Sequence, residues 1–437
     1  MFKPLYYLGC KASFIEPILN ALNDVDSSGG RACDLFSGSG AVASALSGSR
    51  DVTAVDIQEY SRVICSAQLS PTRLSKQHVI ASTARLTESE LAGRLLWALH
   101  PLIEHEKAAI DEALDDSPEA IVELLESYPL TVKNLEKGTS ALSAARAMAM
   151  GRLKKEQLLG VKETTVTTYF GGIYFSFAQA AVLDVALTQA AEAPDNIKDT
   201  LLSASLSAAS VLVNTVGKQF AQPLRPRNKS GLIKAGIGTV IHKDRSMDPV
   251  RVYSEWLSAY ANLPVSKGSH EAFKMDYLDA IKTQGGRFSV VYADPPYTRD
   301  HYSRFYHVLE TMCLRDTPAI STVTKNGKLS LSRGIYREDR HQSPFCIRSE
   351  APKALAELFE ATSQWKLPVV LSYSPHESGD GTHPRVMSGG DIVTIAKRFY
   401  RNVVVELLDG STHNKLNKAA LELNQRKHAE MIVKCFA

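Results

Sequence analysis

The clearest chemical signal in the sequence is an aspartate followed by two prolines and a tyrosine, Asp294, Pro295, Pro296 and Tyr297, directly after the apolar residues 290–293. Proline has no N–H for a sheet and holds φ near about −65°, so the predicted strand ends at Asp294. Open α/β sheets bind ligands at the edge that such a strand end forms. An amino group on a planar ring can donate to the Asp294 carboxylate and the Pro295 carbonyl while Tyr297 stacks on the ring. These residues predict a site for an amine-bearing aromatic ring.

A second signal lies upstream, where a predicted strand breaks into a glycine loop with Gly38 and Gly40 and continues as a helix of small residues, 41–46. Glycines let a ligand approach the backbone closely, and a helix start favours polar or anionic groups. The next predicted strand, 51–55, ends in Asp56, where an acid can accept hydrogen bonds from both hydroxyls of a ribose. This arrangement predicts a nucleotide-binding site.

Two kinds of ligand fit the glycine loop. The spacing Gly38-x-Gly40-x-x-Ala43, followed by an acid at the end of the next strand, matches a nicotinamide dinucleotide fingerprint, so an oxidoreductase stays open on these residues alone. Asp34 favours another ligand, because a carboxylate four residues before the first glycine repels a pyrophosphate and attracts a cation. S-adenosylmethionine, with its sulfonium and amino groups, is such a cationic ligand.

Length and composition describe an ordinary globular chain. Its 437 residues are enough for two to three domains, and 44% hydrophobic with 22% charged residues is typical of folded proteins. The sequence has no apolar run of transmembrane length and does not start like a signal peptide, so we expect a cytoplasmic protein. Its six cysteines are scattered without a Cys-x-x-Cys pair, which predicts neither a disulfide framework nor a bound metal.

The middle of the chain is predicted to be helical. Residues 85–130 carry eleven acidic residues against three Lys or Arg, so we expect this surface to avoid phosphates. Thr87 and Glu90 have the spacing of a capping box at a helix start. Two further helices, at 174–193 and 196–216, are rich in Ala, Ser and Leu at helical spacing and are expected to serve packing.

Two basic loops are candidates for contact with a nucleic acid. Residues 222–251 hold seven Lys or Arg against two Asp and are interrupted by Pro and Gly, which suits contact with phosphates. Residues 333–341 interleave arginines with aromatic residues, which suits contact with a backbone or a displaced strand. The predicted DNA-binding residues are Arg225, Arg227, Lys229, Arg333, Arg337 and Arg340.

The α/β pattern returns after residue 271. Residues 272–277 predict a short strand that ends in Asp276, for which two interpretations stay open: it binds the adenine amine of a cofactor, or it caps the following helix. Three more strands are predicted at 367–373, 402–408 and 430–436, with a polar loop at 411–418 between the last two. This gives seven strands, with a helical insertion after the second.

In these motifs and in their order, the chain resembles the N6-adenine DNA methyltransferases of the Asp-Pro-Pro-Tyr type with the alpha motif order, the Dam-like class. In that family a loop of the form Asp-x-Phe-x-Gly-x-Gly precedes a target-recognition insertion, and Asp-Pro-Pro-Tyr follows. Residues 34–40, 85–270 and 294–297 occur here in that order. The resemblance covers about 250 residues in the two halves of the predicted sheet and weakens in the insertion.

The resemblance implies a Rossmann-like, seven-stranded α/β fold that binds S-adenosylmethionine. It implies a catalytic domain at residues 1–84 and 272–437 and a mainly helical target-recognition insertion at 85–271. Residues 7–11 depart from the commoner Trp-Ala-Gly-Gly-Lys form of the N-terminal motif. By position in the motifs, the catalytic residues are Asp294, Pro295, Pro296 and Tyr297, and the cofactor-binding residues are Tyr7, Lys11, Asp34, Phe36, Gly38, Gly40, Asp56, Asp276 and Asp294.

The implied reaction is methylation of an adenine that is flipped out of double-stranded DNA, for restriction-modification, phage defence or epigenetic marking. The Pro-Cys pair that cytosine-C5 chemistry uses does not occur in the sequence, so direct transfer without a covalent enzyme intermediate is expected. Cytosine-N4 methylation stays open, although that group usually has Ser where Asp294 stands. RNA or protein amine methylation, an oxidoreductase activity and a non-catalytic role in DNA binding stay open as well. The recognition sequence, a partner nuclease and the oligomeric state are not predicted.

Overall fold

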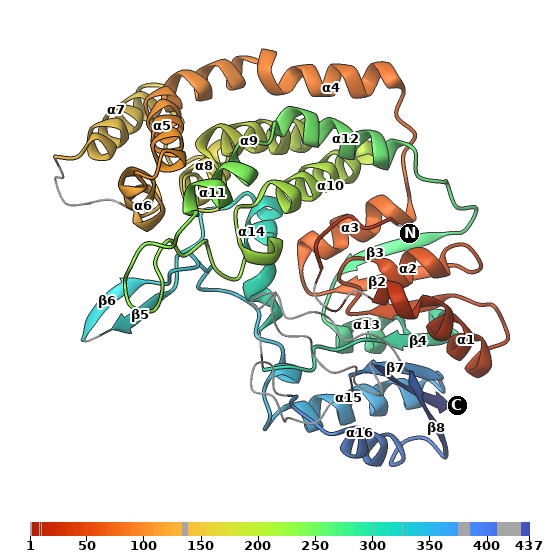
Figure 1. The fold of residues 1–437 in the computed structure, drawn as a ribbon. Coiled ribbons are helices and arrows are strands. Elements are labelled where there is room, and N and C mark those ends of the chain that lie inside the picture. Colours follow the sequence, from red (N-terminus) through yellow and green to blue (C-terminus); the bar gives the residue numbers. More distant parts are fainter. Residues whose placement is uncertain are drawn as a thin grey trace. The chain divides into compact units, whose positions relative to one another are not determined.

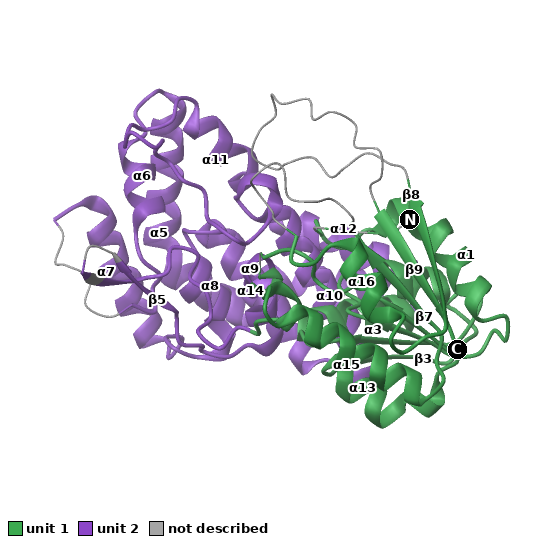
Figure 2. Ribbon diagram, turned by 90° about the horizontal axis from the view of Figure 1, so that it is seen from below, with its two compact units in different colours: residues 1–71, 264–303, 341–437 green, residues 72–263, 304–340 purple. Residues whose placement is uncertain are grey.

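The computed structural model describes residues 2–7, 9, 11–132, 139–299, 301–325, 327–374, 385–408 and 430–437. The chain forms two compact units: unit 1 comprises residues 1–71, 264–303 and 341–437, and unit 2 comprises residues 72–263 and 304–340 (Figure 2). Residues 304–340, which the sequence assigned to the catalytic domain, group with the helical unit. The predicted polar loop at 411–418, and Leu8 and Cys10 of the N-terminal motif, lie outside the described residues.

Unit 1 contains the predicted seven-stranded sheet, in the order β3-β2-β1-β4-β7-β9-β8 (Figure 1). Neighbouring strands are parallel except at β9, which pairs antiparallel with both β7 and β8. This confirms the Rossmann-like α/β fold. The strands are β1 (Ala32–Leu35), β2 (Val52–Asp56), β3 (His270–Lys274), β4 (Val290–Ala293), β7 (Val369–Tyr373), β8 (Asn402–Leu408) and β9 (Glu430–Phe436).

Helices cover both faces of this sheet, because successive side chains of each buried strand point to opposite faces. Ala32 and Val290 pack into one core, with α1 (Ile15–Val25), α2 (Ala41–Leu46) and α3 (Glu59–Leu69). Cys33 and Val291 pack into the other, with α13 (Tyr277–Gln284), α15 (Ala351–Gln364) and α16 (Gly389–Ala396). With both faces covered, the ends of the strands are left for ligands.

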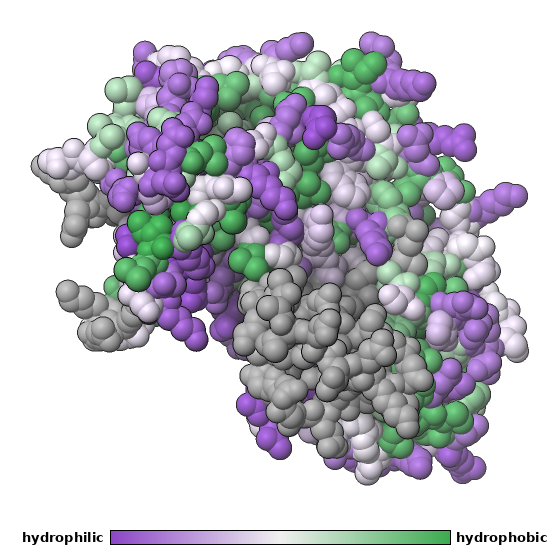
Figure 3. All heavy atoms as spheres, viewed as in Figure 1, coloured by the Kyte–Doolittle hydropathy of each residue, from purple (hydrophilic) through white to green (hydrophobic). Residues whose placement is uncertain are grey.

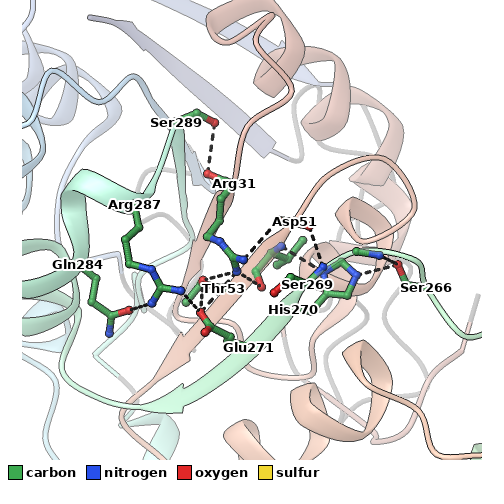
Figure 4. A network of polar contacts seen from close by, with 12 residues as sticks. Arg31, Asp51, Thr53, Ser266, Ser269, His270, Glu271, Gln284, Arg287 and Ser289 are labelled. Atoms are coloured by element: carbon green, nitrogen blue, oxygen red, sulfur yellow. Dashed lines mark hydrogen bonds and ion pairs between the residues drawn. The ribbon is translucent and has the colours of Figure 1, made fainter.

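A polar network fixes the strands at their amino ends (Figure 4). The Arg31 guanidinium, just before β1, lies 3.3 Å from the Asp51 carboxylate before β2 and 3.5 Å from the Glu271 carboxylate of β3. Arg287, before β4, reaches the same Glu271 oxygen at 2.7 Å. These contacts join four strand starts at the edge opposite to the carboxyl ends.

Unit 2 is mainly helical. The predicted capping box is wrong: Thr87 lies inside α4, and Ser89 caps α5 instead, accepting a hydrogen bond from the Ala92 N–H. Its helices are α4 (Lys76–Glu88), α5 (Glu90–Leu114), α6 (Glu119–Glu126), α7 (Ala141–Lys155), α8 (Thr165–Phe170), α9 (Phe177–Glu192), α10 (Asp195–Leu212), α11 (Ile237–Arg245) and α12 (Pro249–Ala261), with most of α14 (Tyr302–Leu314) and the hairpin β5 (Thr322–Lys325) and β6 (Lys328–Leu331). Short 3-10 helices lie at Lys11–Phe14, Lys162–Thr164, Val216–Lys218, Gly285–Arg287 and Pro344–Cys346.

No helix among the described residues is long and apolar enough to cross a membrane. Figure 3 shows hydrophilic and hydrophobic residues interspersed on one face of the molecule. Exposed apolar side chains such as Ile80 in α4, Leu232 in a loop and Leu329 in β6 come from separate elements. Single exposed apolar residues of this kind are normal for a folded protein.

A buried ion pair joins three helices of unit 2. The Arg245 guanidinium of α11 contacts the Glu106 carboxylate of α5, and both side chains are almost fully buried. The other Glu106 oxygen accepts a hydrogen bond from the Phe177 N–H at the start of α9, at 2.8 Å. Arg245 also donates to the Gly172 carbonyl at 3.0 Å. The charges are thus paired and hydrogen-bonded, which is the condition for burying them.

We expect Glu106→Gln to lower the free energy of unfolding of the helical unit by about 3–5 kcal/mol, because it leaves the buried Arg245 charge uncompensated. Denaturant unfolding followed by circular dichroism measures this change. The matched control is Glu112→Gln on the exposed side of the same helix, with an expected change within about 0.5 kcal/mol. The double variant Glu106→Met with Arg245→Met should recover much of the loss, and a Glu106→Gln protein as stable as wild type would contradict the prediction.

Candidate active site

A pocket lies at the carboxyl ends of β1, β2 and β4, inside unit 1. In the sheet Leu35 stands opposite both Val55 and Ala293, so the residues that follow leave the three strands at one edge. The chain continues from β1 to β2 on one side, whereas β4 lies on the other, and ligands of open α/β sheets bind at such a switch point. The predicted residues that line the pocket are Tyr7, Lys11, Asp34, Phe36, Asp56, Asp276, Asp294, Pro295, Pro296 and Tyr297.

Lys11 lies at the centre of the charges around this pocket. Its ammonium is 3.0 Å from Asp294 Oδ1 and 3.2 Å from Glu430 Oε1, and it lies 5.2 Å from the centre of the Tyr297 ring. Burial acts to lower the pKa of Lys11, but Asp294, Tyr297 and Glu430 outweigh it and raise that pKa well above the usual range. Lys11 therefore carries its charge although only 4% of the residue is exposed.

Asp294 lies directly after β4, and its side chain is 20% exposed. Burial raises the pKa of the Asp294 carboxyl above the ordinary range, the Lys11 ammonium lowers it, and the Glu430 charge raises it again. The ionised form of Asp294 thus depends on Lys11. Glu430 was not predicted, because an acid at the first position of a strand is no chemical signal in the sequence.

Asp34 is a buried acid with one free oxygen. Its residue is 1% exposed, and its Oδ2 atom has no hydrogen-bond partner in the described part of the chain. Burial raises the pKa of Asp34 well above its usual range. A hydrogen bond from the Ala43 N–H acts to lower this pKa, whereas the charges of Asp294 and Asp56 act to raise it. Such a group favours either a proton or a cationic hydrogen-bond donor.

Phe36 holds an unusual backbone conformation in the loop after β1. Its φ is +61°, in the left-handed region that costs a non-glycine residue about 1–3 kcal/mol. The ring packs against Tyr277 and Phe345, with ring centres 5.2 and 5.4 Å apart. These aromatic contacts offset the backbone cost and give the pocket an apolar wall.

The glycine at position 38 is required by its surroundings. Its φ is +52°, and a Cβ atom there would lie 2.4 Å from the Tyr7 hydroxyl oxygen. Its N–H donates to Asp56 Oδ2 at 3.0 Å, and the Gln58 N–H donates to Asp56 Oδ1 at 2.9 Å. Asp56 is thereby fixed at the end of β2. Gly38 and Gly40 shape the loop beside the residues that line the pocket.

Asp276 caps a helix. Its Oδ1 atom accepts a hydrogen bond from the Leu278 N–H at 2.8 Å, at the start of α13. The capping interpretation is confirmed by this contact. Asp276 also lines the pocket, so its role toward a cofactor stays a prediction.

Tyr297 is packed on several sides. The residue is 7% exposed, and its ring contacts the Tyr373 ring at 5.4 Å between centres. The Arg385 guanidinium lies over the same ring at 4.6 Å, and Arg385 donates to the Ser374 hydroxyl at 2.7 Å. The ring predicted to stack on a ligand thus has a cation against it in this conformation.

Other pocket residues were missed by the sequence analysis. Ser303, at the start of α14, lines the pocket, and its hydroxyl is buried without a hydrogen-bond partner among the described residues. His341, the last residue of the loop that was interpreted only as a DNA contact, and Pro344 line it as well. A serine in an aromatic helix and a histidine at the end of a basic loop carry no sequence signal, because tertiary contacts alone bring them here.

The six predicted DNA-binding residues lie in unit 2, and two of them are held by acids. Arg337 is 5% exposed and forms paired contacts with Asp316, at 2.7 and 2.8 Å, and with Asp339. Arg227 contacts both oxygens of Glu126, at 3.0 and 3.2 Å. The other four form no ion pair with a described residue: Arg225, Lys229, Arg333 and Arg340.

Comparison with known proteins gives one family match. Residues 7–205 match the family model of the D12 class N6 adenine-specific DNA methyltransferases, a match that begins at Tyr7, includes β1 and β2, and ends within α10. A search of the curated proteins finds no match. The strand end at Asp294 lies after the matched residues and is the same motif on which the resemblance of the sequence to adenine methyltransferases depended. Over residues 7–205 the chain is similar to the D12 class N6 adenine-specific DNA methyltransferases, and this similarity supports an enzyme that methylates adenine in DNA.

Proposed function

We propose that the chain uses S-adenosylmethionine to methylate N6 of an adenine flipped out of double-stranded DNA, at a specific site, as in restriction-modification, phage defence or epigenetic marking. One observation carries this proposal: Asp34, with its free buried oxygen, and Asp294, at the rigid end of β4, face one pocket at the switch point of the sheet. The first suits a cationic methyl donor, and the second suits an amine that accepts the methyl group.

The residues around the glycine loop fit S-adenosylmethionine better than a dinucleotide. Burial raises the pKa of Asp34, and the charges of Asp294 and Asp56 raise it further, so a doubly charged pyrophosphate would add to the repulsion and a cation would relieve it. Bound S-adenosylmethionine supplies a methyl group activated by a positively charged sulfur. The residues proposed to hold it are Tyr7, Asp34, Phe36, Gly38, Gly40, Asp56 and Asp276.

Asp294 and the Pro295 carbonyl are proposed to hold the adenine amine. The lone pair of that amine is spread into the ring, so two hydrogen-bond acceptors fixed by the proline turn favour its localisation on nitrogen. The nitrogen that gains a methyl group loses a proton, and the Asp294 carboxylate is the acceptor that the strand end offers. Lys11 keeps this carboxylate ionised.

Flipping the adenine costs a few kcal/mol, of which stacking on an aromatic ring returns about 1–3 kcal/mol. Tyr297 is proposed for this contact. Since the adenine enters a largely apolar pocket, the hydrogen bonds to Asp294 and Pro295 gain strength from the low local dielectric.

We expect Asp294→Asn to lower the rate of methyl transfer by about 10²- to 10³-fold, because an amide accepts the amine protons more weakly and takes up no proton. The substrate is genomic DNA free of N6-methyladenine, so the assay needs no known recognition sequence, and N6-methyladenine is measured by mass spectrometry of the nucleosides. Calorimetry should show that affinity for S-adenosylmethionine falls far less than the rate.

The control for this experiment is Asp279→Asn, which changes an exposed carboxylate of α13. Its activity should equal that of the wild type. Normal formation of N6-methyladenine by a folded Asp294→Asn protein would remove the basis of the proposed mechanism.

Activity should fall as the pH is lowered through the pKa of Asp294, because the ionised carboxylate is the working form. Burial raises that pKa and Lys11 lowers it, so Lys11→Met should raise it further and move the acidic limb of the kcat/KM profile to higher pH. The profile of Lys11→Arg, which keeps the charge, should stay closer to wild type. An acidic limb that does not move in Lys11→Met would show that another group controls it.

Gly38→Ala should weaken binding of S-adenosylmethionine at least about tenfold, an energy of roughly 1.4 kcal/mol, because the added Cβ displaces the Tyr7 ring. Gly29→Ala is the matched control: its φ is +69°, and nothing lies within 4 Å of the added Cβ. Both variants carry the strain of a positive φ, so only the first should lose affinity in calorimetry. If Gly38→Ala and Gly29→Ala bind S-adenosylmethionine with equal affinity, Tyr7 and Gly38 do not belong to the cofactor site.

A further inference from the structure

A cluster of arginines surrounds one tyrosine in unit 2. The Tyr336 ring has the Arg340 guanidinium 5.2 Å and the Arg304 guanidinium 5.8 Å from its centre. Its hydroxyl donates to the Ala221 carbonyl. The cluster therefore joins the loop around 221–225, the start of α14 and the loop 332–340.

Two more arginines act on this cluster. The pKa of Arg333 is lowered by burial and then by Arg225, and the pKa of Arg340 is lowered by burial and then by Arg304. Glu126 acts on Arg333 in the opposite direction, but its carboxylate is held by Arg227. None of the four forms an ion pair with a described residue: Arg225, Arg304, Arg333 and Arg340.

The loop that carries the cluster is held in place by hydrogen bonds of its own. The Gly334 carbonyl accepts from the buried Tyr174 hydroxyl at 3.0 Å, and the Tyr336 N–H donates to the Ser332 hydroxyl at 3.1 Å. The Arg340 Nε donates to the Arg337 carbonyl at 3.2 Å, while Arg340 Nη1 is buried without a partner among the described residues. The guanidinium of Arg340 is thus positioned and keeps an unused donor.

We propose that Arg225, Arg304, Arg333 and Arg340 form a phosphate-binding platform for the backbone of the DNA substrate, with Arg304 as a contact that the sequence did not predict. The inference rests on DNA being the substrate in the proposed function. Like charges gathered without counter-ions destabilise a fold, and a DNA strand with a phosphate at regular spacing offsets that repulsion. Guanidinium groups also match the geometry of phosphate oxygens. Arg227 and Arg337 are paired with acids, and we assign them to stabilising the two basic loops in which they lie.

The salt dependence of DNA binding tests the platform. The probe is a fluorescent duplex of mixed sequence, whose binding to the full chain is followed by anisotropy over a range of salt concentrations. Each lost phosphate contact reduces the slope of log K against log salt by about 0.9. We expect Arg304→Gln to reduce the slope by this amount and Arg304→Gln with Arg340→Gln to reduce it by about twice as much, with Arg304→Lys close to wild type.

The matched control is Arg152→Gln, which also removes a guanidinium over an aromatic ring of unit 2, 4.9 Å from the centre of the Trp97 ring. Its slope should equal that of the wild type. An unchanged slope in the folded double variant overturns the platform, and so does an equal loss in the Arg152 control. Failure of the proposed function is seen separately, because it removes methylation by the wild type and leaves the salt slopes as they are.

Discussion

The site depends on the charge of Lys11. Five carboxylates gather near the carboxyl ends of the parallel strands, Asp34, Asp56, Asp276, Asp294 and Glu430, and Lys11 is the sole Lys or Arg among the described residues that line the pocket. Burial and mutual repulsion both oppose ionisation of the acids, which is why the pKa of Asp34 and that of Asp294 are raised. Lys11 compensates two of them directly. The negative charge that remains near Asp34 favours a cationic ligand, and this supports the methyl donor over a dinucleotide.

This compensation joins distant parts of the sequence. Lys11 lies before the first strand, Asp294 follows β4, and Glu430 begins the last strand, 419 positions from Lys11. The ionised state of Asp294 therefore requires that the N-terminal segment with Lys11 is in place, whereas the Glu430 charge of β9 opposes it. Glu430 reaches Lys11 through the antiparallel pairing of β9 with β7, because the first residues of β9 then lie at the carboxyl end of β7, where Met431 stands opposite Tyr373. A parallel last strand would carry its first residue to the other edge.

Much of the fold and of the candidate site could be predicted from the sequence, because the effect of the informative residues depends on the residues next to them in the chain. Asp294 ends a strand since prolines follow it, and Gly38 permits a turn that any other residue would strain. Whether a basic residue is paired with an acid could not be predicted in this way, because tertiary contacts decide it. Arg337 and Arg227 have the composition of phosphate contacts, yet Asp316 and Glu126 hold them, whereas Arg304 lies in an aromatic helix and still joins the exposed cluster. The predicted capping box at Thr87 and Glu90 was wrong for a local reason. The helix α4 continues through Thr87, so Ser89 caps α5 instead.

Tyr297 shows what the proposed base contact requires of the protein. Two cations lie against its ring: Lys11, fixed by two carboxylates, and Arg385, which donates to one hydroxyl and has a buried Nε without a partner among the described residues. Displacing Lys11 would leave the buried Glu430 and the partly buried Asp294 uncompensated, which is costly, whereas displacing Arg385 breaks one hydrogen bond to a neutral group. A base that stacks on Tyr297 therefore exchanges with Arg385 and leaves Lys11 in place. The same choice keeps Lys11 beside Asp294 while a base is bound, so the proposed stacking on Tyr297 and the proposed proton acceptance by Asp294 are compatible in one pocket.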